Sequence, residues 1–195
     1  MATAAAAELP LLTTGVLIAQ IRATFEQLPD VRKGGNNQRY AVADAALSAF
    51  AVFFTQSPSF LDYQVRMQKA RGRNNATSLF GAHAIPCDQQ IRNLLDPVPP
   101  AELAPLLLDI VDGLARRGGL ETHRTLAGGF TVALDGTEYF ASHAISCPHC
   151  STRTLTNGQT RYVHIAVTPA LVAPGQAAVF PLPPAFVTPQ DGHTK

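Results

Sequence analysis

Charged side chains are scarce in this 195-residue chain, in which Asp, Glu, Lys and Arg make up only 15% of the residues. The usual share is about a quarter. The formal net charge is +1, so the total charge neither favours nor excludes a nucleic-acid partner. A thinly charged surface indicates that part of it is covered by something outside this chain. Hydrophobic residues make up 46% of the sequence, enough for the core of one large domain or two small ones.

Cysteine is also scarce, and Cys87, Cys147 and Cys150 cannot form an even disulfide framework. The Cys-Pro-His-Cys run favours a protein of the reducing cytoplasm. If the chain binds DNA, we expect it to associate with the nucleoid. No apolar run reaches the ~18 residues that a membrane span needs. The start of the chain has no cationic region and carries Glu8, so we interpret it as a loose leader rather than a signal peptide. We therefore expect no membrane partner.

Three common catalytic motifs are missing from the sequence. It has no Gly-x-x-x-x-Gly-Lys-Ser/Thr phosphate loop, no Gly-x-Ser-x-Gly nucleophile elbow and no His-Glu-x-x-His zinc motif. Nothing favours a nucleotide-cofactor site. Chemistry must therefore be sought in single residues and short clusters.

Helical periodicity dominates residues 1–120. Apolar residues recur at helical spacing, and Ser57 followed by Pro58 is typical of a helix start. The helix over residues 40–54 is apolar around most of its circumference, which predicts a central position. The predicted helices cover residues 11–27, 40–54 and 58–70, a short helix ending at Phe80, residues 85–96 and residues 101–117.

Strand patterns replace helical ones after Gly118-Gly119. We expect strands at residues 129–135, 162–172 and 177–182, and Pro169 and Pro174 limit how far the middle strand can be central. The fold class is therefore α+β, with a leader and first helix over residues 1–28, a helical region over 29–120 and a sheet over 121–195.

Asp135 is the first candidate for chemistry. It follows the apolar, β-branched run from Gly129, which predicts a buried strand ending on a carboxylate. A carboxylate in that position can bind a divalent cation such as Mg²⁺. The alternative is structural, because Asp135-Gly136 is also a strong hairpin-turn signal.

The second candidate is the pair Cys147 and Cys150. Two thiolates at this spacing can hold zinc, which requires four ligands, and no second Cys-x-x-Cys is present. His143, His149 and His164 are candidates to complete the site. The alternative is a pair of cysteines on a hairpin with no metal.

The third candidate is a set of basic and amide side chains in two predicted loops. Arginine, lysine and asparagine suit contacts to DNA phosphates and base edges. The alternative is that both loops are simply solvated. The predicted DNA-binding residues are Arg32, Lys33, Asn36, Asn37, Arg39, Arg66, Lys69, Arg71, Arg73, Asn74 and Asn75.

Many short blocks, taken together and in order, resemble bacterial insertion-sequence transposases of the DDE class. The resemblance extends from about Asp30 to Gly192. The blocks are Asp30-x-Arg32, Tyr40-x-x-x-Asp44-Ala-Ala-Leu-Ser-Ala-Phe50, Phe53-Phe54-x-Gln56-Ser-Pro-Ser-Phe-Leu61, Gly72-Arg-Asn-Asn75, Leu79-Phe-Gly81, Ile85-Pro86, Gln90-Ile-Arg-Asn-Leu-Leu-Asp-Pro97, Leu134-Asp-Gly-Thr-Glu-Tyr139, Cys147-x-x-Cys150, Tyr162-x-His164 and Pro189-Gln-Asp-Gly192.

The resemblance implies a helical region that binds the DNA ends of a mobile element, followed by a ribonuclease-H-like catalytic core. Asp135 would be the first of three acids that hold Mg²⁺ or Mn²⁺ for phosphodiester cleavage and strand transfer. The partners implied are element-end DNA and another transposase chain, either a second copy or the full-length protein.

The sequence departs from this family near its end. Members continue beyond Pro-Gln-Asp-Gly to the other two acids, whereas this chain stops at Lys195, and Ala185 stands where a glutamate is expected. We therefore expect only the first three strands of the ribonuclease-H-like sheet, with the Cys-x-x-Cys hairpin inserted, in a truncated chain that is inactive alone. The alternatives are a zinc-knuckle DNA-binding module that regulates or inhibits full-length transposase, and a non-functional relic.

Overall fold

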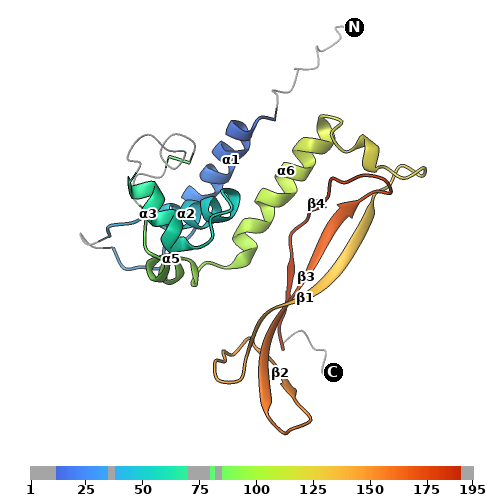
Figure 1. Ribbon diagram of the computed structural model, residues 1–195. Coiled ribbons are helices and arrows are strands. Elements are labelled where there is room, and N and C mark those ends of the chain that lie inside the picture. The colour runs from blue at the N-terminus through green and yellow to red at the C-terminus, as the bar shows by residue number, and fades with distance from the viewer. Residues whose placement is uncertain (1–11, 35–37, 70–79, 82–84, 190–195) are drawn as a thin grey trace. The chain divides into compact units, whose positions relative to one another are not determined.

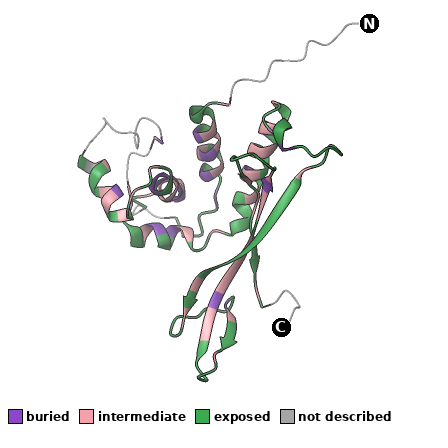
Figure 2. Ribbon diagram, turned by 45° about the vertical axis from the view of Figure 1, so that its right-hand side comes forward, coloured by how far each residue is buried: buried purple, intermediate pink, exposed green. Residues whose placement is uncertain are grey.

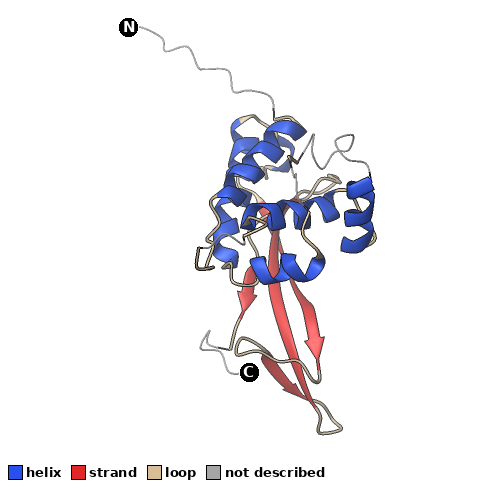
Figure 3. Ribbon diagram, turned by 90° about the vertical axis from the view of Figure 1, so that its left-hand side faces the viewer, coloured by secondary structure: helices blue, strands red, loops and turns tan. Residues whose placement is uncertain are grey.

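The computed structural model describes residues 12–34, 38–69, 80–81 and 85–189 (Figure 1). The chain divides into two compact units, residues 1–106 and 107–195. This division falls within helix α6 (Ala104–Arg116), whereas the sequence pattern placed the boundary after residue 120. The described elements are α-helices followed by an antiparallel sheet (Figure 3), so the α+β class is confirmed.

The first unit is helical, and α2 is its central element. Helix α2 contacts α1, α3 and α5 and buries seven of its thirteen residues, which confirms the position predicted from its apolar circumference. The helices of this unit are α1 (Thr14–Glu26), α2 (Val42–Phe54), α3 (Phe60–Lys69) and α5 (Asp88–Leu95).

Two clusters of buried side chains form the core of the helical unit, as the buried segments in Figure 2 indicate. One joins Ile18 of α1, Tyr63 of α3 and Phe80 to α2, and the other joins Ala45 of α2 to α5. Burial of such side chains contributes roughly 1.5–3 kcal/mol each. The helices could be predicted from the spacing of apolar residues because each of them packs its apolar face against α2.

The start of α3 corrects one prediction. Ser57 does not cap the helix, because its hydroxyl lies 2.9 Å from Thr55 Oγ1. Ser59 takes that role, accepting a hydrogen bond of 3.0 Å from the backbone N–H of Asp62. The short helix predicted up to Phe80 falls outside the described residues.

The second unit contains α6 and a five-stranded antiparallel sheet. Strand β3 is central, with β1 along one edge and β2, β5 and β4 along the other. The strands are β1 (Thr131–Ser142), β2 (Ser151–Thr154), β3 (Thr160–Val172), β4 (Phe180–Pro181) and β5 (Ala185–Val187).

Strand β1 differs from its prediction in length and burial. It continues through Gly136, which pairs with Val167, and through a bulge between Glu138 and Phe140. Within the described structure it is exposed along almost its whole length, with Leu134 72% exposed (Figure 2). The prediction of a buried strand ending at Asp135 is therefore wrong, and so is the alternative of an Asp-Gly turn.

The prolines limit how much of β3 is paired on both edges, as predicted: the pairing with β5 and β4 is interrupted at Pro169, and β3 ends at Val172, before Pro174. Pro169 lies opposite Leu134 of β1, and its carbonyl accepts a hydrogen bond of 2.9 Å from the N–H of Leu182. A residue in an antiparallel strand directs its nitrogen and its carbonyl to the same edge. The missing N–H of Pro169 therefore faces the stretch between β5 and β4, where Pro183 and Pro184 interrupt the pairing. Of the strand predicted over residues 177–182 only Phe180–Pro181 forms a strand, β4, and β5 lies after the predicted range.

None of the helices within the described ranges is long and apolar enough to cross a bilayer.

Candidate metal centre

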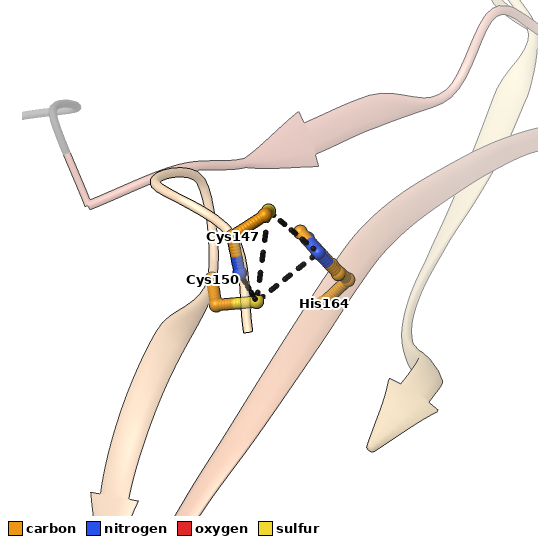
Figure 4. Close-up of side chains that lie close together, drawn as sticks. All are labelled: Cys147, Cys150 and His164. Atoms are coloured by element: carbon orange, nitrogen blue, oxygen red, sulfur yellow. Dashed lines mark hydrogen bonds between the residues drawn. The ribbon is translucent and has the colours of Figure 1, made fainter. Parts of the chain in front are cut away.

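The Cys-x-x-Cys turn lies between β1 and β2, directly before β2. The backbone N–H of Cys150 donates to the carbonyl of Cys147 at 3.0 Å, and the N–H of Cys147 donates to Cys150 Sγ at 3.2 Å. These two bonds curl the turn so that both sulfurs lie on one side. His164 comes from the central strand β3 and faces them (Figure 4).

The three side chains lie at distances that suit a tetrahedral zinc ion. Cys147 Sγ and Cys150 Sγ are 3.7 Å apart, and His164 Nε2 lies 3.4 Å from the first sulfur and 3.3 Å from the second (Figure 4). With Zn–S bonds of about 2.3 Å and Zn–N bonds of about 2.0–2.1 Å, two tetrahedral ligand sulfurs are about 3.8 Å apart and a sulfur and a nitrogen about 3.6 Å. The group can therefore hold a metal ion such as zinc with little rearrangement.

Aromatic rings support the histidine. Tyr139 stacks on His164 with ring centroids 5.7 Å apart, and Phe140 lies 5.5 Å from the same ring. Phe186 of β5 packs edge-on against Tyr139 at 5.9 Å. Partial burial raises the pKa of Tyr139, and its proximity to Cys147 and Cys150 raises it further. These rings hold His164 in the orientation that its Nε2 needs to face the sulfurs.

The other two histidine candidates do not join the group. His143 Nδ1 lies 3.1 Å from the carbonyl oxygen of Thr160, and His149 is exposed within the turn. Among the described residues, Cys147, Cys150 and His164 are the only set of three or more metal-binding side chains within reach of one another. His164 is thus the histidine that the structure selects from the three.

Asp135 lies in the middle of β1, opposite Thr168. Its side chain is exposed, and its Oδ2 accepts a hydrogen bond of 3.3 Å from Thr137 Oγ1. It belongs to no group of three metal-binding side chains within the described ranges. The structure therefore gives no support for Mg²⁺ or Mn²⁺ at this position.

The first basic loop is partly held by its own contacts. The Arg32 guanidinium binds both carboxylate oxygens of Asp30, at 2.8 and 2.6 Å, and donates to the Tyr40 carbonyl at 3.0 Å. Arg39 lies over the Tyr40 ring at 5.2 Å, and Lys33 is exposed. Arg32 thus fastens the loop to the residues just before α2.

The second basic set begins on α3. Arg66 forms an ion pair of 2.8 Å with Asp62 one turn earlier, and Lys69 is exposed at the helix end. The remaining predicted DNA contacts lie outside the described residues: Asn36, Asn37, Arg71, Arg73, Asn74 and Asn75.

One charged cluster was not predicted. Arg153 of β2 and Arg161 of β3 lie opposite each other, and both guanidiniums approach Glu138 of β1 at 3.4 Å. The sequence signal was a pair of arginines flanking the Asn157-Gly158 turn, and the register of the hairpin was needed to bring them together.

Comparisons of the chain with protein-family models, with characterised proteins and with solved structures give no match.

Proposed function

We propose that this chain is a DNA-binding part of a transposase of the DDE class. The observation that carries the proposal is the succession β1, β3 and β4–β5, which form an antiparallel meander with β3 in the middle and Asp135 on the first strand. The resemblance implies the first three strands of a ribonuclease-H-like core, with Asp135 on the first of them. The Cys-x-x-Cys hairpin lies between the first two of these segments, also as the resemblance implies.

Asp135 serves in this proposal as one ligand for Mg²⁺ or Mn²⁺. Two-metal phosphoryl transfer needs several carboxylates to hold both ions against the scissile phosphate, and the described residues bring no others together around Asp135. The proposed activity of the chain by itself is therefore DNA binding without cleavage. Cleavage would require further acids beside Asp135.

The test is duplex binding and cleavage with element-end DNA. We expect the purified chain to bind the duplex at low salt, with affinity that falls as salt rises because phosphate contacts release counterions. We expect no Mg²⁺- or Mn²⁺-dependent nicking or strand transfer. Absence of duplex binding would overturn the proposed DNA-binding function. Clear cleavage that disappears in Asp135→Ala would overturn the proposal that the chain alone does not cleave DNA.

A second candidate function is a zinc-knuckle DNA-binding module that regulates a full-length transposase. The group of Cys147, Cys150 and His164 favours it, because its spacing fits zinc and a zinc ion would fix the turn to the central strand. When bound, the ion would supply structural cross-linking. Tetrahedral zinc would take a fourth ligand besides these three described side chains.

Metal analysis of the purified chain tests this candidate. We expect about one zinc per chain, and loss of most of it in Cys150→Ser or His164→Ala, because each removes one of three protein ligands. Cys87→Ser is the matched control, since Cys87 is exposed and lies outside the group. Equal zinc content in Cys87→Ser and Cys150→Ser would exclude the site.

A further inference from the structure

Strands β2 and β3 form a hairpin that begins directly after the metal group, and β1 pairs with the other edge of β3 as far as Tyr162. A tight turn closes it, in which Gly158 has a φ of +78° and its N–H donates to the Leu155 carbonyl at 2.9 Å. The side chains of Asn157 and Gln159 brace the turn through a hydrogen bond of 3.0 Å. The metal group lies at the opposite end of the hairpin from the turn, because Cys150 precedes β2 and His164 lies on β3. The turn therefore fixes one end of the hairpin, and a metal ion held by the group would fix the other.

The charge of this segment has one sign. From Tyr139 to Gln190 the sequence contains no Asp or Glu and no Lys, and its only arginines are Arg153 and Arg161. These two lie directly opposite each other in the hairpin. Like charges in that position destabilise an antiparallel pair, so the position requires an anion.

Glu138 supplies only part of the negative charge that the two arginines need. Its two oxygens each lie 3.4 Å from one of the guanidiniums, and one carboxylate balances one of two positive charges. The arginine side chains are 53% and 34% exposed, whereas that of Glu138 is 27% exposed. Each guanidinium has five N–H donors, and among the described residues no hydrogen bond engages them. The outer sides of both arginines thus remain available to a second anion.

We propose that the β2–β3 hairpin binds double-stranded DNA, with Arg153 and Arg161 contacting backbone phosphates. The inference rests on the proposed DNA-binding function and assigns that function a surface outside the two basic loops. Beyond the last residue pair with β1, where Arg153 lies opposite Arg161 and Thr154 opposite Thr160, the hairpin is two-stranded, and a two-stranded β-ribbon fits the major groove of B-DNA. Arginine forks match phosphate oxygens, and the uncompensated positive charge of the Arg153–Glu138–Arg161 cluster suits a polyanion.

The experiment measures binding of a short fluorescent duplex to the full, zinc-supplemented chain by anisotropy over a range of salt concentrations. We expect Arg153→Gln and Arg161→Gln each to weaken binding roughly tenfold at low salt, the effect of one charged hydrogen bond. The double variant should lower the slope of log affinity against log salt by about 1.8, because each phosphate contact contributes about 0.9. Circular dichroism checks that the variants remain folded.

Two further variants distinguish a DNA contact from a loss of structure. Glu138→Gln should tighten binding, because it removes the carboxylate that competes with phosphate for both guanidiniums. Arg116→Gln is the matched control: Arg116 is exposed and paired with an acid, Asp112, at 2.7 Å, but on α6. It should leave the slope unchanged.

Each result has a distinct meaning. If the unaltered chain binds DNA while the double variant keeps its salt slope and Glu138→Gln has no effect, the hairpin is not the contact and the DNA-binding function stands. If the unaltered chain binds no duplex, the function and the hairpin proposal both fall. If the unaltered chain binds single-stranded DNA or RNA with higher affinity than double-stranded DNA, the proposal that the hairpin binds double-stranded DNA is wrong.

Discussion

At the scale of single residues, the most defined polar contact is that of Asp30 with Arg32. Two guanidinium nitrogens and the backbone N–H of Arg32 all donate to the Asp30 carboxylate, at 2.6 to 3.1 Å. These bonds lower the pKa of Asp30 from 3.8 to about 2. Arg32, predicted as a DNA contact, therefore has a role within the chain that does not require DNA.

The depressed pKa has a measurable consequence. The carboxyl of Asp30 has a lower pKa in the folded state than in the unfolded chain. The Asp30–Arg32 pair therefore stabilises the fold at pH values above the ordinary aspartate pKa of 3.8, and this contribution is lost as the pH falls toward about 2. A carbon-13 NMR titration of the carboxyl should show a midpoint near that value. Arg32→Gln should return the midpoint toward 3.8, and Lys33→Gln should not. A midpoint that is the same with and without Arg32 would contradict the assignment.

The candidate site could be predicted from sequence only in part. The Cys147–Cys150 pair was identified because its spacing is local, and His164 was one of three histidines that spacing could not separate. His143 is engaged by the Thr160 carbonyl, a contact that depends on how β1 and β3 align. The Arg153–Arg161 pair depends on the register of a hairpin, which the turn sets. Contacts that depend on strand register therefore could not be predicted from the sequence.

At the scale of elements, the helices and the central strand β3, predicted over residues 162–172, could be located from the sequence, whereas the extent and burial of β1 could not. Periodicity locates α1, α2 and α5 because each packs one face against the helical core. Strand β1 has no such signal, because it is exposed and Gly136 resembles a break although it pairs within the ladder. Pro169 was informative, because the pairing of β3 with β5 and β4 is interrupted where this residue has no N–H to donate.

The metal group makes a prediction for the hairpin as an element. Removal of metal with a chelator should speed hydrogen exchange at residues 147–154 and 160–164, because these backbone segments are held by the ligands. Residues 131–135 should exchange at an unchanged rate, since their pairing with β3 involves none of the three ligands. Mass spectrometry of the exchanged protein measures both segments at once.

A matched variant strengthens that experiment. Cys150→Ser should show the faster exchange without chelator and respond to it only weakly. Equal exchange at residues 147–154 with and without chelator, in a chain shown to hold zinc beforehand, would mean that the metal does not organise the hairpin.

At the scale of the whole molecule, the two units differ in how they are stabilised. The helical unit has two clusters of buried side chains around α2. In the sheet unit, the described part of β1 buries no side chain fully, and β3 buries only Val163 and Leu171. Large apolar side chains such as Leu134 and Tyr139 are exposed instead. That another molecule covers part of this surface stays a prediction.

The span between the metal-binding residues has a further consequence. A metal ion bound by Cys147 and His164 would close a loop in which the two residues are 17 positions apart. For a covalent cross-link of similar length, the loss of freedom in the unfolded chain is worth about 3 kcal/mol. Zinc would thus act as a reversible cross-link. The rigidity of the hairpin would rise with the concentration of free zinc and fall with the concentration of competing thiols around the protein.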